Sequence, residues 1–368
     1  MKHHLTIVAT LAILAGTHDA NAYAPHVYAN GISAHNIAAI QHTITQTAIR
    51  EFAGSMGNAI MTSDVPVSLT NEDPTTTYGR APMYGTAPMY GEYNDDGSAG
   101  RSGGDRFNAN AALSNIWINW QHMGDNAKFD NFSRLDTKFD TAMLGISGGQ
   151  TELMGAMSKW GIYTGYVGGT QENSDISIDG QGGYFGIYNG NTFGKFGIYA
   201  TANGGVIDNS ADFADNSGTS TDEYTNFWIG GAVNATYNIE LDRTFTLQPA
   251  LHVGYTWIKS ENYTSASGDI LENDAFSILD VSPEIRAIKH IANGWFGAMH
   301  VKYAMIFDNG GDLSVNHTTA DTLETDNFIE YGISLEKSVA NISFHANFGR
   351  RDGARDGWIG GLNIKYLF

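Results

Sequence analysis

The sequence of 368 residues contains no cysteine. Disulfide scaffolds, cysteine-bound metals and thiol nucleophiles are therefore excluded. Basic residues are also few: 20 Lys and Arg stand against 39 Asp and Glu, a net charge of −19. Because proteins that bind nucleic acids present positive charge to the phosphates, this balance argues against a nucleic-acid partner. Beyond the N-terminus, no segment approaches the about 20 consecutive apolar residues of a transmembrane helix.

The N-terminus carries the features of an export signal. Met1-Lys-His-His4 precedes the apolar run Leu5 to Ala15, and Ala20-Asn21-Ala22 offers small residues to a signal peptidase. The run is too short to span a membrane. We therefore interpret residues 1–22 as a signal peptide, with a buried N-terminal helix as the alternative.

The last residues of the chain alternate apolar and polar side chains. Trp358, Leu362, Ile364, Tyr366 and Phe368 fall on one face and Asn363 and Lys365 on the other, while Ile359 and Leu367 break the pattern. One face suits lipid and the other suits water. Since every backbone N–H and C=O must be paired inside a bilayer, such a strand is viable only in a closed barrel.

The same two-residue period recurs in about twelve segments from residue 113 onward, an even number as in single-chain bacterial barrels. Glycine and aromatic residues are abundant, with 44 Gly, 18 Tyr, 18 Phe and 7 Trp. The sequence thus predicts an all-β fold, a twelve-stranded antiparallel transmembrane barrel. Polar residues at inward positions predict an internal network that narrows any channel; these lumen-facing candidates are Asn115, Asn119, His252, His300, Lys302, Asn363 and Lys365.

The predicted connections alternate between short turns and the long polar segments 124–135, 208–225, 260–274 and 308–326. Outer-membrane barrels have short turns in the periplasm and long loops outside, whereas a soluble β-sandwich does not sort its loops in this way. The loop 208–225 is acidic and holds Asp208, Asp212, Asp215, Asp222 and Glu223. Such acids bind divalent cations or bias passage toward cations, but we favour a role in solubility. Arg350, Arg351 and Arg355 are placed in the last outer loop, where they pair with acids or contact lipopolysaccharide.

Residues 23–111 differ from the barrel region at 112–368. Ser33 is a predicted N-cap for an amphipathic helix of about 33–52 that presents Ile37, Ile40, Ile44, Ala48 and Phe52 on one side. A helix that plugs the lumen and a helix in the periplasm are both left open. The rest of this segment is low in complexity and predicted to be a disordered linker. It contains the direct repeat Ala81-Pro-Met-Tyr-Gly-Thr86 and Ala87-Pro-Met-Tyr-Gly91, for which a Tyr/Met recognition element is the less favoured reading.

Residues 112–368 resemble the β-domain of autotransporters. The resemblance is carried by Asn115-Ile-Trp-Ile-Asn-Trp120, Gly161-Ile-Tyr-Thr-Gly-Tyr166, Gly183-Tyr-Phe-Gly-Ile-Tyr188, Phe196-Gly-Ile-Tyr-Ala200, Leu247-Gln-Pro-Ala-Leu251 and the terminal Tyr366-Leu-Phe368. It implies a twelve-stranded barrel in the outer membrane of a Gram-negative bacterium, with a helix inside the pore. It also implies insertion by the barrel-assembly machinery, with Leu362, Ile364, Tyr366 and Phe368 as the recognition signal. No long repetitive passenger precedes the barrel, and no Asn-Asn pair of the kind cleaved in some members follows the helix.

These observations predict a non-enzymatic outer-membrane barrel of autotransporter type, either a translocator or a surface-interaction protein. A porin-like channel for small solutes or cations is the alternative, and a barrel hydrolase is less favoured. For the latter, Ser343 and His345 share a strand face but lack an evident orienting acid. No cofactor is predicted, and without a His-Glu-x-x-His motif no metal site is named. The expected partners are outer-membrane lipid, lipopolysaccharide and the assembly machinery, and any host or surface ligand is unidentified.

Overall fold

The computed structural model describes residues 28–51 and 113–368, apart from residues 130, 131, 150, 154, 216, 217, 267, 293, 312, 321, 322 and 324. The predicted signal peptide 1–22, Phe52 and the linker with its Ala81–Gly91 repeat lie outside the described residues. Among the described residues, no helix is both long and apolar enough to cross a membrane.

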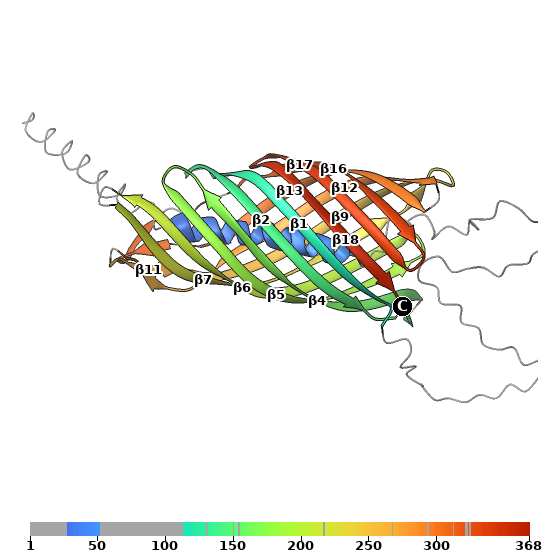
Figure 1. Ribbon diagram of the computed structural model, residues 1–368, viewed down its shortest axis with the longest axis horizontal. Helices are drawn as coiled ribbons and strands as arrows, with labels where there is room; N and C mark the ends of the chain where they lie inside the picture. Colours follow the sequence, from blue (N-terminus) through green and yellow to red (C-terminus); the bar gives the residue numbers. More distant parts are fainter. Residues whose placement is uncertain are drawn as a thin grey trace, which may run out of the picture.

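Twelve long strands of the described chain close into one antiparallel barrel (Figure 1), which confirms the predicted fold class. Each strand pairs with the next along the chain, and the last pairs with the first, so the ring has no free edge. The barrel strands are β1 (Asn115–Phe129), β2 (Phe132–Ser147), β4 (Ala156–Glu172), β5 (Ile176–Phe193), β6 (Phe196–Asp215), β7 (Gly218–Tyr237), β9 (Phe245–Ser260), β12 (Phe276–Ala292), β13 (Trp295–Gly310), β16 (Phe328–Val339), β17 (Ile342–Gly353) and β18 (Arg355–Leu367).

Side chains that alternate with a period of two in the sequence point alternately to the outer and the inner face of the barrel. On β18, Leu362 and Ile364 are 56% and 48% exposed on the outside, while Asn363 between them is buried inside. Register supports the closure, because Asn119 of β1 lies opposite Asn363 and Trp120 lies opposite Leu362. Apolar residues thus face apolar residues across the seam between β18 and β1, and this part of the outer face is apolar enough to contact lipid.

The two ends of the barrel differ. At the end that holds the C-terminus, tight turns join β5 to β6, β12 to β13 and β16 to β17, with positive φ at Gly194, Gly294 and Ala340. We call this the turn end and the opposite one the hairpin end. Two very short strands, β3 (Thr151–Leu153) and β8 (Ile239–Glu240), pair with β4 and β9.

At the hairpin end, the segments predicted as loops 260–274 and 308–326 contribute a second small sheet. It consists of β10 (Tyr263–Thr264), β11 (Ile270–Asn273), β14 (Leu313–Val315) and β15 (Thr318–Ala320), with β11 and β14 joining the two segments. These short strands were not predicted, because two to four residues are too few to reveal a period.

The prediction of long loops at 124–135 and 208–225 was wrong. Strands β6 and β7 each run for 20 residues, about twice the length that crosses a bilayer. All of the acidic residues assigned to an outer loop therefore lie on strands: Asp208, Asp212 and Asp215 on β6, and Asp222 and Glu223 on β7. The hairpin continues beyond the lipid because its ladder pairs the backbone in water as well as in the membrane.

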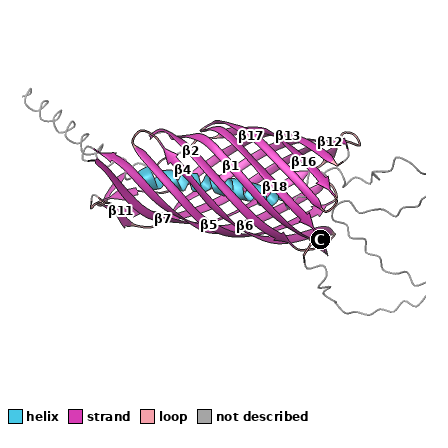
Figure 2. Ribbon diagram, viewed as in Figure 1, coloured by secondary structure: helices cyan, strands magenta, loops and turns pink. Residues whose placement is uncertain are grey.

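A single helix over the described residues 28–51 lies inside the barrel, along its length (Figures 1 and 2). The predicted N-cap at Ser33 is wrong, because the chain is already helical at residue 28. Ser33 lies within the helix, and its hydroxyl bonds the hydroxyl of Tyr224 on β7 at 2.7 Å. From the sequence alone, a serine whose hydroxyl bonds a side chain of the barrel wall cannot be told from a serine that caps a helix.

The wall on one side of the helix depends on glycine. Trp117 of β1 lies over Gly145 of β2, and Tyr184 of β5 lies over Gly165 of β4. A Cβ at either glycine would overlap the aromatic ring. Glycine at these positions lets large inward rings lie flat against the wall and leaves room for the helix.

Candidate functional site

The candidate functional site is the contact between the helix and the inner wall. The helix is amphipathic, and its apolar side, with Ile37, Ile40 and Ile44, belongs to the main buried cluster. The wall facing this cluster is aromatic and comes from β1, β4, β5, β6 and β7; it includes Trp117, Tyr163, Tyr184, Tyr188, Tyr199 and Trp228. A hydrogen bond joins two of these rings: Trp117 Nε1 donates to the Tyr188 hydroxyl at 3.1 Å.

The opposite part of the wall, from β9 to β18, carries buried charges. His42 of the helix bonds Asp280 of β12 through Nδ1, and its Nε2 lies 2.8 Å from Nζ of Lys302 on β13. Lys302 in turn lies 3.1 Å from Glu330 of β16. Each of these side chains is almost fully buried. Buried charges persist only when they are paired, so the helix completes this network.

The network continues through two arginines. Arg351 of β17 donates to Glu330 at 2.9 Å and lies 3.6 Å from Asp125 of β1. Arg355 of β18 donates to Asp125 at 3.0 Å and to the side-chain oxygen of Asn36 on the helix at 2.5 Å. The predicted place of Arg351 and Arg355 in an outer loop was therefore wrong. Both are buried inside the barrel, because inward parity on paired strands directs them to the helix.

The third arginine behaves differently. Arg350 of β17 points outward, donates to Asp352 at 3.2 Å and to Asp356 at 2.6 Å, and lies over the ring of Trp358. Arg350 thus pairs with acids of its own hairpin and not with the acidic residues of β6 and β7.

The two ends of the helix are fixed at opposite ends of the barrel. At the turn end, Lys365 of β18 lies 2.8 Å from the Glu51 carboxylate and donates to its carbonyl oxygen at 3.1 Å. At the hairpin end, Ala29 and Ile32 are buried against residues near the strand tips, and the Tyr224 hydroxyl donates to the Ala29 carbonyl at 3.1 Å. The helix therefore runs from the hairpin end to the turn end.

The family model described as "Autotransporter beta-domain" matches residues 116–355. The chain belongs to the autotransporter β-domain family. This autotransporter barrel is therefore an outer-membrane protein of a Gram-negative bacterium, in contact with the lipid of that membrane. Because outer-membrane barrels have short turns in the periplasm and long loops outside, we expect the hairpin end to face the outside and the turn end to face the periplasm.

Solved structures show the same fold at low identity. The β-domain of the Bordetella autotransporter BrkA is 14% identical, with a TM-score of 0.59 over 70% of this chain and 100% of that one. The translocator domain of NalP from Neisseria meningitidis is 10% identical, with a TM-score of 0.61 over 71% and 90%. The transport unit of AIDA-I from Escherichia coli is 13% identical, with a TM-score of 0.56 over 72% and 93%. A search of curated proteins gives no match.

The lumen-facing candidates all lie on the inner face of this autotransporter barrel. Asn115, Asn119, His252, His300, Lys302, Asn363 and Lys365 are between 1% and 9% exposed. The barrel brings some of them together: His300 and Lys302 both contact Glu330, at 3.5 and 3.1 Å. Asn115 instead accepts from Ser147 at 2.9 Å, far from that group.

The acidic residues of β6 and β7 whose side chains are described lie on both faces of the barrel. Asp208 and Asp212 point outward and accept from threonine hydroxyls across the hairpin, at 2.8 and 2.5 Å. Asp222 is buried and accepts from the backbone N–H of Ala266 at 2.8 Å. The suspected Ser343 donates to Glu336 at 3.0 Å.

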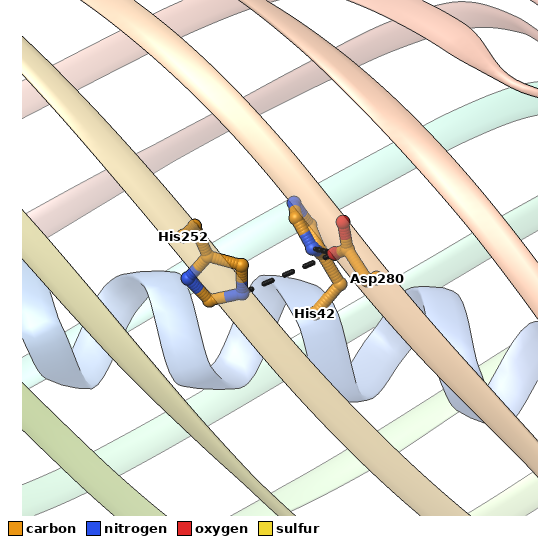
Figure 3. Close-up of side chains that lie close together, drawn as sticks. All are labelled: His42, His252 and Asp280. Carbon is orange, nitrogen blue, oxygen red and sulfur yellow. Dashed lines mark hydrogen bonds and ion pairs between the residues drawn. The ribbon is translucent and has the colours of Figure 1, made fainter.

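Several residues of the site were missed in the sequence. Among the described residues, only His42, His252 and Asp280 bring three potential metal ligands together (Figure 3). Asp125, Asp280, Glu284, Glu330, Arg351 and Arg355 all occupy inward positions, so carrying the alternation through every strand would have found them. Their pairing with the helix depends on which residues of the helix face which strands, and the sequence does not encode this locally.

Proposed function

We propose that this protein is a non-enzymatic, plugged translocator-type barrel that holds the chain preceding its helix toward the outside of the cell. The direction of the helix carries this proposal. Its start lies near Tyr224 at the hairpin end, and Glu51 lies near Lys365 at the turn end. The start of the helix is therefore directed toward the outside, the arrangement that a translocator requires.

The tight fit of the helix argues against a porin-like channel. Three cavities beside it have volumes of about 40, 20 and 20 Å³, room for about one to three water molecules each. Opening a path for solutes would require the charged network to separate from the helix, which leaves buried charges unpaired. The proposal therefore takes the plugged, closed barrel as the resting state of the protein.

The division of the chain forms part of the proposal: a signal peptide at 1–22, an N-terminal segment at 23–111 and the barrel at 112–368. Residue 51 and Asn115 both lie at the turn end, since Asn115 pairs with Leu367. The two described residues that flank the linker thus lie at the end of the barrel that we assign to the periplasm. This reading favours a linker over a surface-exposed recognition element for the Ala81–Gly91 repeat.

The outward residues of β18 support the proposed encounter with the barrel-assembly machinery. Leu362, Ile364, Tyr366 and Phe368 form an exposed apolar row that ends the chain. Lipopolysaccharide is the proposed partner on the outside of the cell. Of the described basic residues in the last hairpin, Arg350 is the one proposed to face lipopolysaccharide.

The test places one epitope at residue 24 and, in a second strain, one at Gly85. The proposal predicts that antibody stains the first strain on intact cells and the second only after the outer membrane is permeabilised. Staining of both, or of Gly85 alone, would contradict it. Conductance measurements in planar bilayers distinguish the translocator from the porin-like channel. A large stable conductance of the intact protein favours the porin. Conductance only after deletion of residues 23–112 favours the plugged translocator.

A further inference from the structure

Three side chains from three separate elements meet inside the barrel. His42 comes from the helix, His252 from β9 and Asp280 from β12, and all three point toward one another (Figure 3). Their potential ligand atoms lie within 4.8 Å of one another. Nε2 of His252 is 3.9 Å from Oδ2 of Asp280, and Nδ1 of His42 contacts the same oxygen.

His252 is the least explained of the three. It is 1% exposed, and among the described residues neither of its ring nitrogens has a hydrogen-bond partner. A buried imidazole without a partner is costly. Gly254 leaves space beside this ring, since a Cβ there would lie 3.1 Å from Nε2. The wall thus keeps an accessible nitrogen aimed at Asp280 and His42.

The surroundings suit a ligand. A cavity of about 40 Å³ adjoins the three side chains and is also lined by Gln41, whose amide atoms have no hydrogen-bond partner within the described chain. Ser282 donates to Oδ1 of Asp280 at 2.5 Å. This bond orients the carboxylate and leaves Oδ2 toward the histidines, as outer partners do for metal-binding carboxylates.

We infer that His42 Nδ1, His252 Nε2 and Asp280 Oδ2 form a binding site for a divalent transition-metal ion of the Zn²⁺ type. Two imidazoles and one carboxylate match the preference of Zn²⁺ for nitrogen and oxygen ligands. Ligand atoms around tetrahedral Zn²⁺ lie about 3.3 Å apart, so small side-chain rotations suffice. The cavity supplies room for a water molecule as fourth ligand. Ca²⁺ and Mg²⁺ fit poorly because they require mainly oxygen ligands.

Lys302 opposes the binding of a cation at this site. Its Nζ lies 2.8 Å from Nε2 of His42, so this nitrogen accepts a hydrogen bond from the Lys302 ammonium and Nδ1 donates to Asp280. Binding at Nδ1 requires the other tautomer of His42, with its proton on Nε2. The Lys302 ammonium must then turn away from Nε2–H, since two donors cannot share a hydrogen bond. Lys302 retains Glu330 as its partner at 3.1 Å, so the switch leaves no buried charge unpaired.

The site has a structural consequence for the plug. Because its ligands belong to the helix and to two strands, a bound ion ties the helix to the wall. An ion that binds only this arrangement stabilises it in proportion to its concentration. The inference is independent of the proposed translocator role, since it concerns only the folded barrel with its helix.

The experiment uses the full mature protein, without an affinity tag, folded in detergent and titrated with Co²⁺ as a spectroscopic probe. The expected result is one Co²⁺ per barrel with the intense visible absorption of a four-coordinate ion, displaced by Zn²⁺. His252→Gln is expected to weaken binding at least about 100-fold, since outer partners alone contribute about 10- to 100-fold. His345→Gln is the matched control, because His345 also faces the lumen but lies on β17 outside the trio.

Folding of each variant is checked by its migration on unheated gels. If His252→Gln fails to fold, Ser282→Ala takes its place, with an expected loss of about 10- to 100-fold because Asp280 loses its orienting bond. Absence of stoichiometric Co²⁺ binding by the unaltered protein would overturn the inference. So would equal affinity in the unaltered protein and in whichever of these two variants folds.

Discussion

Lys365 of β18 and Glu51 of the helix form an ion pair of 2.8 Å at the turn end of the barrel, and both side chains are nearly buried. Lys365 also donates to the backbone carbonyl of Glu51 at 3.1 Å. The pair thus fixes the end of the helix to the last strand, which pairs with β1 along its length. This relationship gives the helix a defined depth in the pore.

Removing one member of this pair is expected to destabilise the plugged barrel. Lys365→Met leaves Glu51 as an uncompensated buried charge, which costs about 3–5 kcal/mol. The measurement is the urea midpoint of the folded, fast-migrating form on unheated gels. Lys365→Met combined with Glu51→Leu removes both charges and is expected to recover most of the loss. If the single variant is as stable as the unaltered protein, the pair does not anchor the helix.

A second prediction concerns the glycines that lie beneath the aromatic rings of the inner wall. Gly165→Ala places a methyl group into the ring of Tyr184, and overpacking of this kind costs about 1–3 kcal/mol. The measurement is the same urea midpoint. Gly183→Ala on the neighbouring strand is the control, since a Cβ there meets nothing closer than 3.7 Å. Equal midpoints for the two variants would show that the Tyr184 ring moves aside without cost.

The architecture could be predicted from the sequence because its main determinant is local. Alternation marks which residues of β13 face lipid, such as Met299 and Val301, and which face inward, such as His300 and Lys302. Closure then follows from the need to pair every backbone group in the membrane. The position of the helix followed only from the resemblance, since an amphipathic helix without a visible partner fits the lumen and the periplasm equally well.

The functional site could be predicted only in part. The inward residues His252 and Lys365 were expected from parity, but their partners His42 and Glu51 lie far away in the sequence. The depth of the helix in the barrel decides these pairs, and a shift of the helix by a few residues would change all of them. The acids on β6 and β7 were assigned to a loop because charge marks exposure to water and does not distinguish a loop from a strand that extends beyond the membrane.

A third prediction concerns Ser33 at the outer end of the helix. The Ser33 hydroxyl bonds that of Tyr224, so Ser33→Ala is expected to cost about 1 kcal/mol. Tyr224→Phe is expected to cost more, because it also removes the bond to the Ala29 carbonyl. The double variant should then cost less than the sum of the two, because both changes remove one shared bond. The measurement is a double-mutant cycle of urea midpoints. Strict additivity would indicate that the two hydroxyls act independently.

The final prediction tests where the membrane ends along β6. Ala202 and Asp208 both point outward on this strand, and Asp208 lies farther toward the hairpin end. Ala202→Arg is expected to cost about 2–4 kcal/mol, because it places a charge among lipid tails, whereas Asp208→Arg should cost at most about 1 kcal/mol. Folding into lipid vesicles at a series of urea concentrations gives both values. If the two arginines cost the same, β6 does not leave the bilayer between these residues, and the strand's outer half lies in lipid rather than in water.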